Sequence, residues 1–192
     1  LCSCYVWNWE ITKYTAEKIK NKNTNCLVIM GGPQIPNHSE EFFKNHPYVD
    51  IIVHGEGELV LSNIFREYLN EKNFLQIKGI ETKDFKNEPE DRIKDLDNLA
   101  SPYLTNVVWD LAEKVPDVNF LASWETNRGC PYQCTFCDWG SLTNARMTKW
   151  SEDVLFKEIE WFADNKIPYV DCCDANFGIF QKRDFKLAEK FK

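Results

Sequence analysis

Residues 26–33 read CLVIMGGP, a run of five apolar residues that ends in two glycines and a proline. A continuous apolar run of this length is typical of a strand buried on both faces, as in a parallel sheet covered by helices. The pattern returns at residues 49–57, VDIIVHGEG, where a second strand-like run again ends in glycines. Two buried strands that each end in a glycine-rich turn predict a parallel α/β sheet.

Helical periodicity fills the intervals between these strands. Residues 1–6, LCSCYV, are expected to form a first strand, and Ser39 is placed to cap a short helix with two glutamates in its first turn. Apolar spacing predicts the buried faces of two longer helices, one with Ile11, Thr15 and Ile19 and the other with Leu61, Ile64, Phe65 and Tyr68. This alternation of strand and helix favours a doubly wound, Rossmann-like sheet with helices on both faces.

The alternation stops between Phe74 and Val118. This segment is charged, contains three prolines and shows only a weak two-residue alternation at 77–80, so we expect a connector with a small hairpin. Strand and helix signals then return at residues 120–126, in a helix capped by Ser151 with Leu155, Ile159 and Phe162 on one face, at 168–173, and from Gln181 onward. The sequence predicts two incomplete α/β domains, 1–73 and 118–192, joined by a connector at 74–117.

Composition restricts the class of protein. The chain has 192 residues, 43% of them hydrophobic, and a formal net charge of −7. That charge repels a phosphate backbone and disfavours nucleic-acid binding, so a small-molecule or peptide substrate fits better. Because no apolar run is long enough for a membrane helix and no signal peptide is visible, we expect a cytoplasmic protein without a membrane anchor. The first residue is Leu1 and the last residues resemble the middle of a helix, which predicts an internal fragment of a longer protein.

Three of the eight cysteines, Cys130, Cys134 and Cys137, have the spacing C-x3-C-x2-C in the loop GCPYQCTFCDWG at 129–140. Crowded thiols next to glycine and proline indicate a metal or cluster site. Structural zinc sites normally have four protein ligands and no fourth lies nearby, whereas a [4Fe-4S] cluster can accept three thiolates and leave one iron open. A zinc knuckle completed elsewhere and a redox-active thiol pair remain alternatives. The other five cysteines are expected to be buried small hydrophobes: Cys2, Cys4, Cys26, Cys172 and Cys173.

The stretch ETNRGCPYQCTFCDWG at 125–140 resembles the cluster loop of radical S-adenosylmethionine (SAM) enzymes. The residues before it, with MGGP after one strand and VHGEGE after the next, look like the cobalamin-binding domain of the cobalamin-dependent branch of that family. The segment DLDNLASPYL is similar to the connector between the two domains in that branch. The resemblance implies an incomplete Rossmann-like cobalamin-binding domain followed by the first part of a partial (β/α)6 radical SAM barrel.

The resemblance also implies site residues. The three loop cysteines would hold a [4Fe-4S] cluster whose open iron binds SAM. Contacts with SAM would come from Phe136, Trp139, Gly140, Asp174 and Asn176, and contacts with cobalamin from Gly31, Gly32, Pro33, Gly55, Glu56 and Gly57. Without the family resemblance, Asp174 and Asn176 are also compatible with a polar turn at a strand end, and the glycines are compatible with tight turns. His38 and His54 are expected to be solvated.

The implied activity is that of a cobalamin-dependent methyltransferase acting on an unactivated carbon. Side chains alone do not break such a C–H bond, whereas a radical cofactor does. An electron donor such as flavodoxin or ferredoxin would be a partner. Other radical SAM reactions, namely rearrangement, ring contraction or chemistry without cobalamin, are the alternatives, and a non-enzymatic zinc module is the third class.

Overall fold

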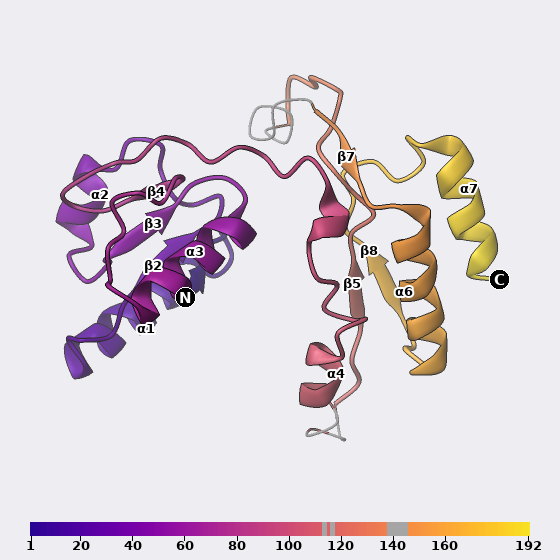
Figure 1. Ribbon diagram of the computed structural model, residues 1–192, viewed down its shortest axis with the longest axis horizontal. Coiled ribbons are helices and arrows are strands. Elements are labelled where there is room, and N and C mark those ends of the chain that lie inside the picture. The colour runs from indigo at the N-terminus through magenta and orange to yellow at the C-terminus, as the bar shows by residue number, and fades with distance from the viewer. Residues whose placement is uncertain (113–114, 116–117, 138–145) are drawn as a thin grey trace. The chain divides into compact units, whose positions relative to one another are not determined.

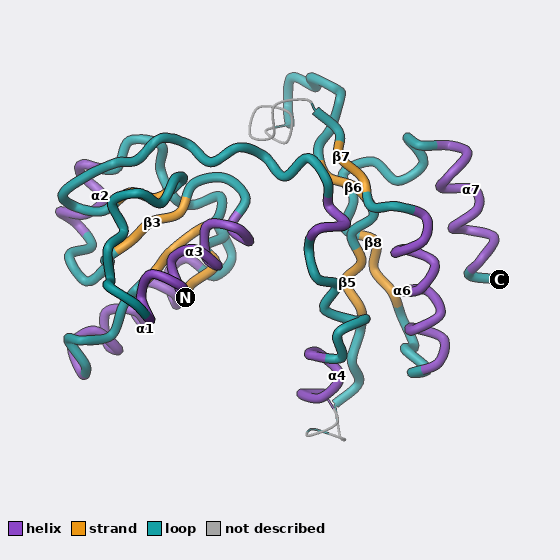
Figure 2. Tube along the Cα trace, in the orientation of Figure 1, coloured by secondary structure: helices purple, strands orange, loops and turns teal. Residues whose placement is uncertain are grey.

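The computed structural model describes residues 1–112, 115, 118–137 and 146–192. The chain divides into two compact units, Leu1–Arg92 and Ile93–Lys192. Each unit combines short parallel strands with helices, and long loops join these elements (Figure 2). The α/β class predicted from the alternating pattern is confirmed in both units.

The sheet of the first unit has the order β1-β2-β3-β4. Strands β1 (Cys2–Ser3), β2 (Ile29–Gly31) and β3 (Ile51–Val53) run parallel, and β4 (Ile80–Glu81) pairs with β3 in the antiparallel direction. In the register, Gly31 lies beside Val53, so β2 and β3 end at the same edge of the sheet. Strand β4 begins at the end of the segment 77–80, where the sequence shows a weak two-residue alternation. The antiparallel bridge between Glu81 and Lys86 forms the predicted small hairpin.

Helices cover both faces of this sheet, as predicted (Figure 1). Helices α1 (Trp9–Lys22) and α2 (Glu40–Asn45) share a core with one face, around Met30 and Ile52. Helix α3 (Gly57–Leu69) packs on the opposite face against the alternate residues of the same strands, Ile29, Ile51 and Val53. Because successive residues of a strand point to opposite faces, one continuous apolar run supplies both cores.

The predicted buried face of α1 is wrong. Ile11, Thr15 and Ile19 are exposed, and the helix contacts the sheet through Ala16, which is 2% exposed. Lys20 on that side donates to both carboxylate oxygens of Asp50, at 2.8 and 2.7 Å, and to the carbonyl of Cys26 at 2.8 Å. A small residue and an ion pair fix the orientation of this helix, and neither is visible to a search for apolar periodicity.

The predicted face of α3 is partly wrong. Val60 and Ile64 are fully buried and Leu61 packs against them, whereas Phe65 is 49% exposed. The core contact of α3 therefore lies on the side of Val60.

The second unit contains the parallel pair β5 (Ala122–Trp124) and β8 (Val170–Cys172), with helix α6 (Glu152–Asp164) between them in the chain. Ser151 caps α6 by accepting a hydrogen bond from the backbone N–H of Val154, as predicted. Among the residues that the structure describes, this unit also contains the 3-10 helix η1 (Leu96–Asn98), α4 (Val107–Ala112) and α7 (Gln181–Lys190).

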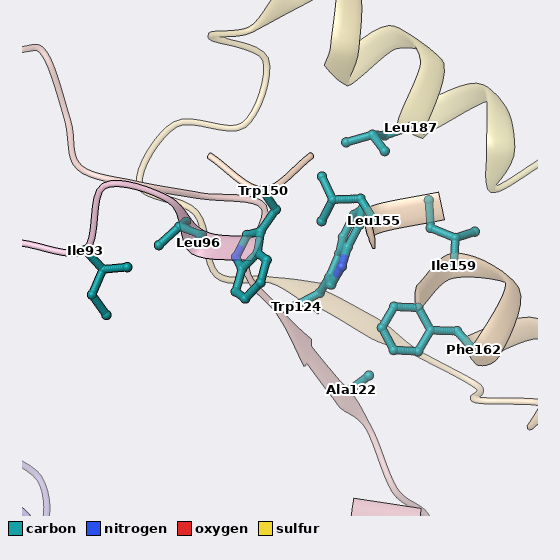
Figure 3. Packing of buried hydrophobic residues seen from close by; sticks show 9 residues of the cluster. All are labelled: Ile93, Leu96, Ala122, Trp124, Trp150, Leu155, Ile159, Phe162 and Leu187. Atoms are coloured by element: carbon teal, nitrogen blue, oxygen red, sulfur yellow. The ribbon is translucent and has the colours of Figure 1, made fainter. Parts of the chain in front are cut away.

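Trp124 lies at the centre of the core of the second unit (Figure 3). The predicted face of α6 is confirmed, because Leu155, Ile159 and Phe162 are all buried beside it. Leu187 of α7 and Leu96 of η1 complete the same core. Leu96 belongs to the segment 74–117 that reads as a connector, so this segment contributes β4 to the first unit and part of the core to the second.

A buried carboxylate reinforces this core. Glu158 is 5% exposed, and it accepts hydrogen bonds from Ser101 Oγ at 2.5 Å and from Trp124 Nε1 at 2.8 Å. Burial raises the pKa of Glu158, and these two hydrogen bonds only partly offset the rise. The contact fastens the segment around Ser101 to α6 and β5.

No helix in the described ranges is long and apolar enough to cross a membrane.

The turn after β2 requires glycine at position 32. Gly32 has φ +108°, and a Cβ built there would lie 2.7 Å from the carbonyl oxygen of Cys4. We expect Gly32→Ala to lower the free energy of local opening around β1 and β2 by about 3 kcal/mol, because backbone strain adds to a backbone clash. Hydrogen exchange of the β1 and β2 amides measures this.

Gly57→Ala is the matched control, since its Cβ would meet only Leu61 Cδ1 at 3.6 Å. Equal protection factors in the two variants would contradict the requirement for glycine at position 32.

Candidate functional site

The loop that carries three cysteines is closed at its base by two short strands. β6 (Asn127–Arg128) and β7 (Thr148–Lys149) pair antiparallel on either side of the loop. Gly129 follows β6 with φ +101°, and a Cβ at this position would lie 2.6 Å from the carbonyl oxygen of Arg146. Only glycine allows the two ends of the loop to approach this closely. The chain leaves β5 at Trp124, passes through β6 and enters the loop at Gly129.

The three loop thiols differ in exposure. Cys130 is 8% exposed, whereas Cys134 and Cys137 are exposed and joined by a turn in which Cys137 N donates to the Cys134 carbonyl at 3.1 Å. Among the residues that the structure describes, no three Cys, His, Asp or Glu side chains converge as ligands of one metal ion. Phe136, predicted to contact SAM, is 90% exposed. Trp139 and Gly140 lie outside the described residues.

Asn176 and Cys130 are brought together from positions 46 residues apart. Asn176 lies in the turn after β8, and its Nδ2 donates a hydrogen bond to Cys130 Sγ at 3.0 Å. Parallel strands β5 and β8 end at the same edge, which explains how this turn reaches the start of the cysteine loop. The structure thus places one predicted SAM contact directly against a predicted metal ligand.

Asp174, in the same turn, binds the strand end of β5. Its Oδ1 accepts hydrogen bonds from the backbone N–H groups of Thr126 and Asn127, at 2.7 and 3.1 Å. Its Oδ2 accepts from Asn127 Nδ2 at 2.7 Å and from the hydroxyl of Thr126. The carboxylate therefore fastens the end of β8 to the residues that lead into the cysteine loop.

Three further residues complete this arrangement, and the sequence reading missed them. Thr126 is fully buried, and Arg183 of α7 donates to its carbonyl and to its Oγ1, at 2.8 Å each. Arg183 also pairs with Asp184, whose Oδ2 accepts from the backbone N–H groups of Gly178 and Phe180, at 2.8 and 3.0 Å. In the sequence, Arg183 and Asp184 look like an exposed, charged first turn of a helix, yet they are 4% and 2% exposed.

The other five cysteines follow the prediction only in part. Cys4 is fully buried, and burial raises its pKa to about 11; Cys2 and Cys26 are half-buried. Cys172 and Cys173 are exposed at the end of β8, so the expectation that they are buried is wrong. The apolar residues around the two cysteines correctly predict a strand. Cys172 lies in that strand, β8, and Cys173 lies next to it, but the residues of β8 are not buried on both faces.

In the first unit, the predicted cobalamin contacts form two neighbouring turns. Gly31 is the last residue of β2 and is followed by Gly32 and Pro33, and Gly55, Glu56 and Gly57 follow β3 at the same edge of the sheet. Gly55 has φ +76°, and a Cβ there would have no atom within 4 Å, so the backbone faces open space. The Glu56 carboxylate lies 3.4 Å from Arg92 Nη2. These turns are suited to a ligand that approaches the backbone closely.

A buried carboxylate lies beside these turns. Glu81 is 8% exposed; its Oε2 lies 3.0 Å from His54 Nε2 and 2.9 Å from Lys86 Nζ, and its Oε1 accepts from the hydroxyl of Ser39. Burial alone would raise the pKa of Glu81, but hydrogen bonds from Ser39, Lys86 and His54 outweigh it and hold the pKa below its ordinary value.

Two sequence expectations are corrected by this contact. Ser39 precedes α2 as predicted, but it makes no side-chain capping hydrogen bond because its hydroxyl is turned to Glu81. His54 is only partly exposed, with its Nε2 facing the same carboxylate, whereas His38 is exposed as expected.

Two curated relatives match nearly the whole chain. The 2-(S-pantetheinyl)-carbapenam-3-carboxylate methyltransferase of Streptantibioticus cattleyicolor is 39% identical over 193 residues, covering 97% of this chain and 28% of the relative. The cobalamin-dependent radical SAM methyltransferase TokK of Streptomyces tokunonensis is 38% identical with the same coverage of both chains. The chain belongs to the cobalamin-dependent radical SAM family. It spans about 28% of the length of these two members, and no protein-family model matches it.

Solved structures of radical SAM enzymes have the same fold. The cobalamin-dependent SAM radical enzyme OxsB, with aqua-cobalamin and SAM bound, superimposes with a TM-score of 0.73 at 19% identity, over 98% of this chain and 27% of OxsB. The methyltransferase TsrM from Kitasatospora setae, with cobalamin and a [4Fe-4S] cluster bound, gives 0.66 at 16% identity, over 93% of this chain and 35% of TsrM. At these identities the likeness concerns the fold alone.

Asp174→Asn tests the strand-end contact. The amide keeps the shape of the carboxylate, but its nitrogen would face hydrogen-bond donors of Thr126 and Asn127. We expect the free energy of unfolding of the second unit to fall by about 2 kcal/mol, because charge-assisted hydrogen bonds are lost and the new amide N–H groups face the N–H and O–H donors of Asn127 and Thr126. Urea unfolding followed by tryptophan fluorescence, to which buried Trp124 contributes, measures this.

Asp171→Asn on β8 is the control, since Asp171 is exposed on the same strand. An equal loss of stability in both variants would argue against a special contact at Asp174.

Glu81→Gln tests the carboxylate of the first unit. A carboxyl whose pKa is depressed in the folded state stabilises the fold at neutral pH, and this contribution is lost as the pH falls through the folded pKa. We therefore expect the wild type to exceed Glu81→Gln in unfolding free energy by about 2 kcal/mol at pH 7, with the difference shrinking toward about pH 3. Urea titrations at both pH values measure this.

Glu88→Gln, at an exposed position on the same segment, is expected to change stability little at either pH. A stability difference for Glu81→Gln that stays constant with pH would contradict the role assigned to the charge.

Proposed function

We propose that this chain is part of a cobalamin-dependent radical SAM methyltransferase that modifies an unactivated carbon of a small molecule. The observation that carries the proposal is the cysteine loop: three thiols at C-x3-C-x2-C spacing, at the carboxyl end of a parallel strand and in contact with the turn of the neighbouring strand. The relatives named as methyltransferases, which align over 97% of the chain, support this reading.

The residues of the loop fit an iron-sulfur cluster. In a [4Fe-4S] cluster each thiolate binds a different iron, so the thiols surround the cluster without meeting at one point. This agrees with Cys130, Cys134 and Cys137, which the structure holds in one short loop but not around a single ion. Three thiolates leave one iron free for an outside ligand, which we take to be SAM. When bound, the cluster and SAM supply a radical for hydrogen abstraction, and cobalamin supplies the methyl group.

The residues proposed for SAM have different tasks. Phe136 is exposed between Cys134 and Cys137 and offers a free aromatic surface to the adenine. Asn176 lies against Cys130 and has an amide oxygen as well as a nitrogen. Both oxygens of Asp174 accept hydrogen bonds from Thr126 and Asn127, so its task is to position the turn that carries Asn176. Trp139 and Gly140 remain candidates from the sequence motif.

The first unit fits a bulky cofactor at the edge of its sheet. The proposed contacts are Gly31, Gly32 and Pro33 at the end of β2 and Gly55, Glu56 and Gly57 after β3, with the backbone at Gly55 open on the side where a Cβ would lie. Glu81 holds His54 at the start of the second turn, which limits the motion of that turn. We assign cobalamin to this edge because a relative at 38% identity is named cobalamin-dependent.

The substrate class and the electron donor are parts of the same proposal. A relative acting on a carbapenam carboxylate and a structure of TsrM with tryptophan both favour a small-molecule substrate. An electron donor such as flavodoxin or ferredoxin would reduce the cluster. A different radical reaction is the second candidate, because the chain is also 28% identical over 131 residues to the anaerobic magnesium-protoporphyrin IX monomethyl ester cyclase of Rubrivivax gelatinosus.

Replacement of each loop cysteine tests the proposal. In the full-length protein, purified without oxygen and reconstituted with iron and sulfide, we expect Cys130→Ala, Cys134→Ala and Cys137→Ala each to lose cluster iron and the formation of 5'-deoxyadenosine from SAM. Each change removes one of only three ligands. Iron and sulfide analysis, electron paramagnetic resonance and product detection measure these losses.

Cys173→Ala is the control, because Cys173 is another exposed thiol outside the loop. Stoichiometric zinc without iron in the wild type would favour the zinc module instead. Absence of corrin after growth with cobalamin would favour a radical SAM enzyme that does not use the vitamin.

A further inference from the structure

The hydrogen bond between Asn176 and Cys130 singles out one of the three loop thiols. Its donor is the side-chain amide Nδ2 and its acceptor is Sγ, 3.0 Å away. Cys130 is the buried member of the trio, while Cys134 and Cys137 are exposed. Hydrogen bonds are electrostatically stronger where water is excluded, so a donor at Cys130 has more influence on its sulfur than a comparable donor at an exposed thiol.

The turn that carries Asn176 is fixed at both ends. Before it, Asp174 binds the backbone of Thr126 and Asn127. After it, Asp184 accepts from the N–H groups of Gly178 and Phe180. The Asp184 carboxylate is itself paired with buried Arg183, and Arg183 binds Thr126 in turn.

This closed set of contacts holds the amide of Asn176 in place before any ligand binds. A donor held in advance loses little entropy when it makes its bond, so the N–H can act on the sulfur throughout the reaction.

We propose that Asn176 is a positioning residue for the Cys130 thiolate, and that its N–H donation raises the reduction potential of the cluster bound there. The inference rests on the proposed function, since it needs a cluster at the three cysteines. A thiolate only accepts hydrogen bonds, so the amide nitrogen is the end that faces it. Donation withdraws negative charge from the sulfur and thereby favours the reduced, more negative cluster. The amide oxygen stays available to SAM.

The test compares Asn176→Ala and Asn176→Asp with the wild type in the reconstituted full-length protein. Alanine removes the donor, and aspartate keeps the shape while replacing the donor by a negative acceptor. We expect both variants to keep wild-type iron and sulfide but to have a more negative reduction potential, with the larger shift in Asn176→Asp. A redox titration followed by electron paramagnetic resonance, made without SAM, measures the potential independently of any SAM contact.

Phe177→Leu is the control, because Phe177 is the next residue of the same turn and is 45% exposed. Its potential is expected to match that of the wild type. An unchanged potential in Asn176→Ala with a full complement of iron would overturn the inference. Loss of iron from both Asn176 variants with wild-type circular dichroism would also overturn it, because the residue would then support the loop without tuning the cluster.

Failure of the proposed function gives a different result. In that case the wild type itself would bind no iron-sulfur cluster under the same conditions.

Discussion

The carboxylate of Asp174 is the contact on which the candidate site of the second unit depends. It joins residues 48 positions apart by accepting two backbone and two side-chain hydrogen bonds at the end of β5. Close by, Arg183 and Asp184 are buried as an ion pair. Charges in a low-dielectric interior are tolerated only when every partner is in place, because an unpaired buried charge costs several kcal/mol. These contacts therefore specify one arrangement of the strand ends, which the apolar core alone would not do.

In the first unit, too, one carboxylate joins several loops near the strand ends. Glu81 on β4 brings together Ser39 before α2, His54 after β3 and Lys86 on the following hairpin. The apolar residues of β2 and β3 stabilise the sheet by packing, which is not directional, whereas the contacts of Glu81 join specific polar groups of the loops. In each unit a carboxylate near the carboxyl edge of the sheet, Glu81 or the half-buried Asp174, links the loops that carry the proposed cofactor contacts. Such ordering is what a site needs before it can bind.

The sequence predicted the elements better than the contacts between them. The apolar runs at 26–30 and 49–53 fall on β2 and β3, and the periodicity of Leu155, Ile159 and Phe162 gave the buried face of α6. Periodicity failed on α1, where Ala16 and the Lys20–Asp50 pair determine the packing. A one-dimensional pattern records how apolar a position is, but it does not record which charge lies opposite after folding.

The candidate site shows the same limit more sharply. The spacing of the three cysteines is local, so it identifies the loop directly, whereas the contacts at the loop and at the strand end before it join residues 46 to 57 positions apart. Arg183 and Asp184 have the sequence signature of a solvated helix start, and only the fold buries them. For Cys172 and Cys173 the prediction is wrong in the opposite direction, because their apolar neighbours in the sequence predict burial and both side chains are exposed in the structure.

The exposure of the cysteine loop is itself informative about its task. Tyr132 is 56% exposed and Phe136 is 90% exposed, and an aromatic side chain left in water forgoes about 1.5–3 kcal/mol of burial energy. Between these residues and beside them lie two exposed thiols, while the base of the loop is held closely at Gly129 and Cys130. A loop with a fixed base and an apolar, sulfur-bearing tip gains stability from what binds to it. Buried Cys130 accepts a hydrogen bond from Asn176, whereas Cys134 and Cys137 are exposed, and this difference is why we propose that the protein acts on the cluster through Cys130.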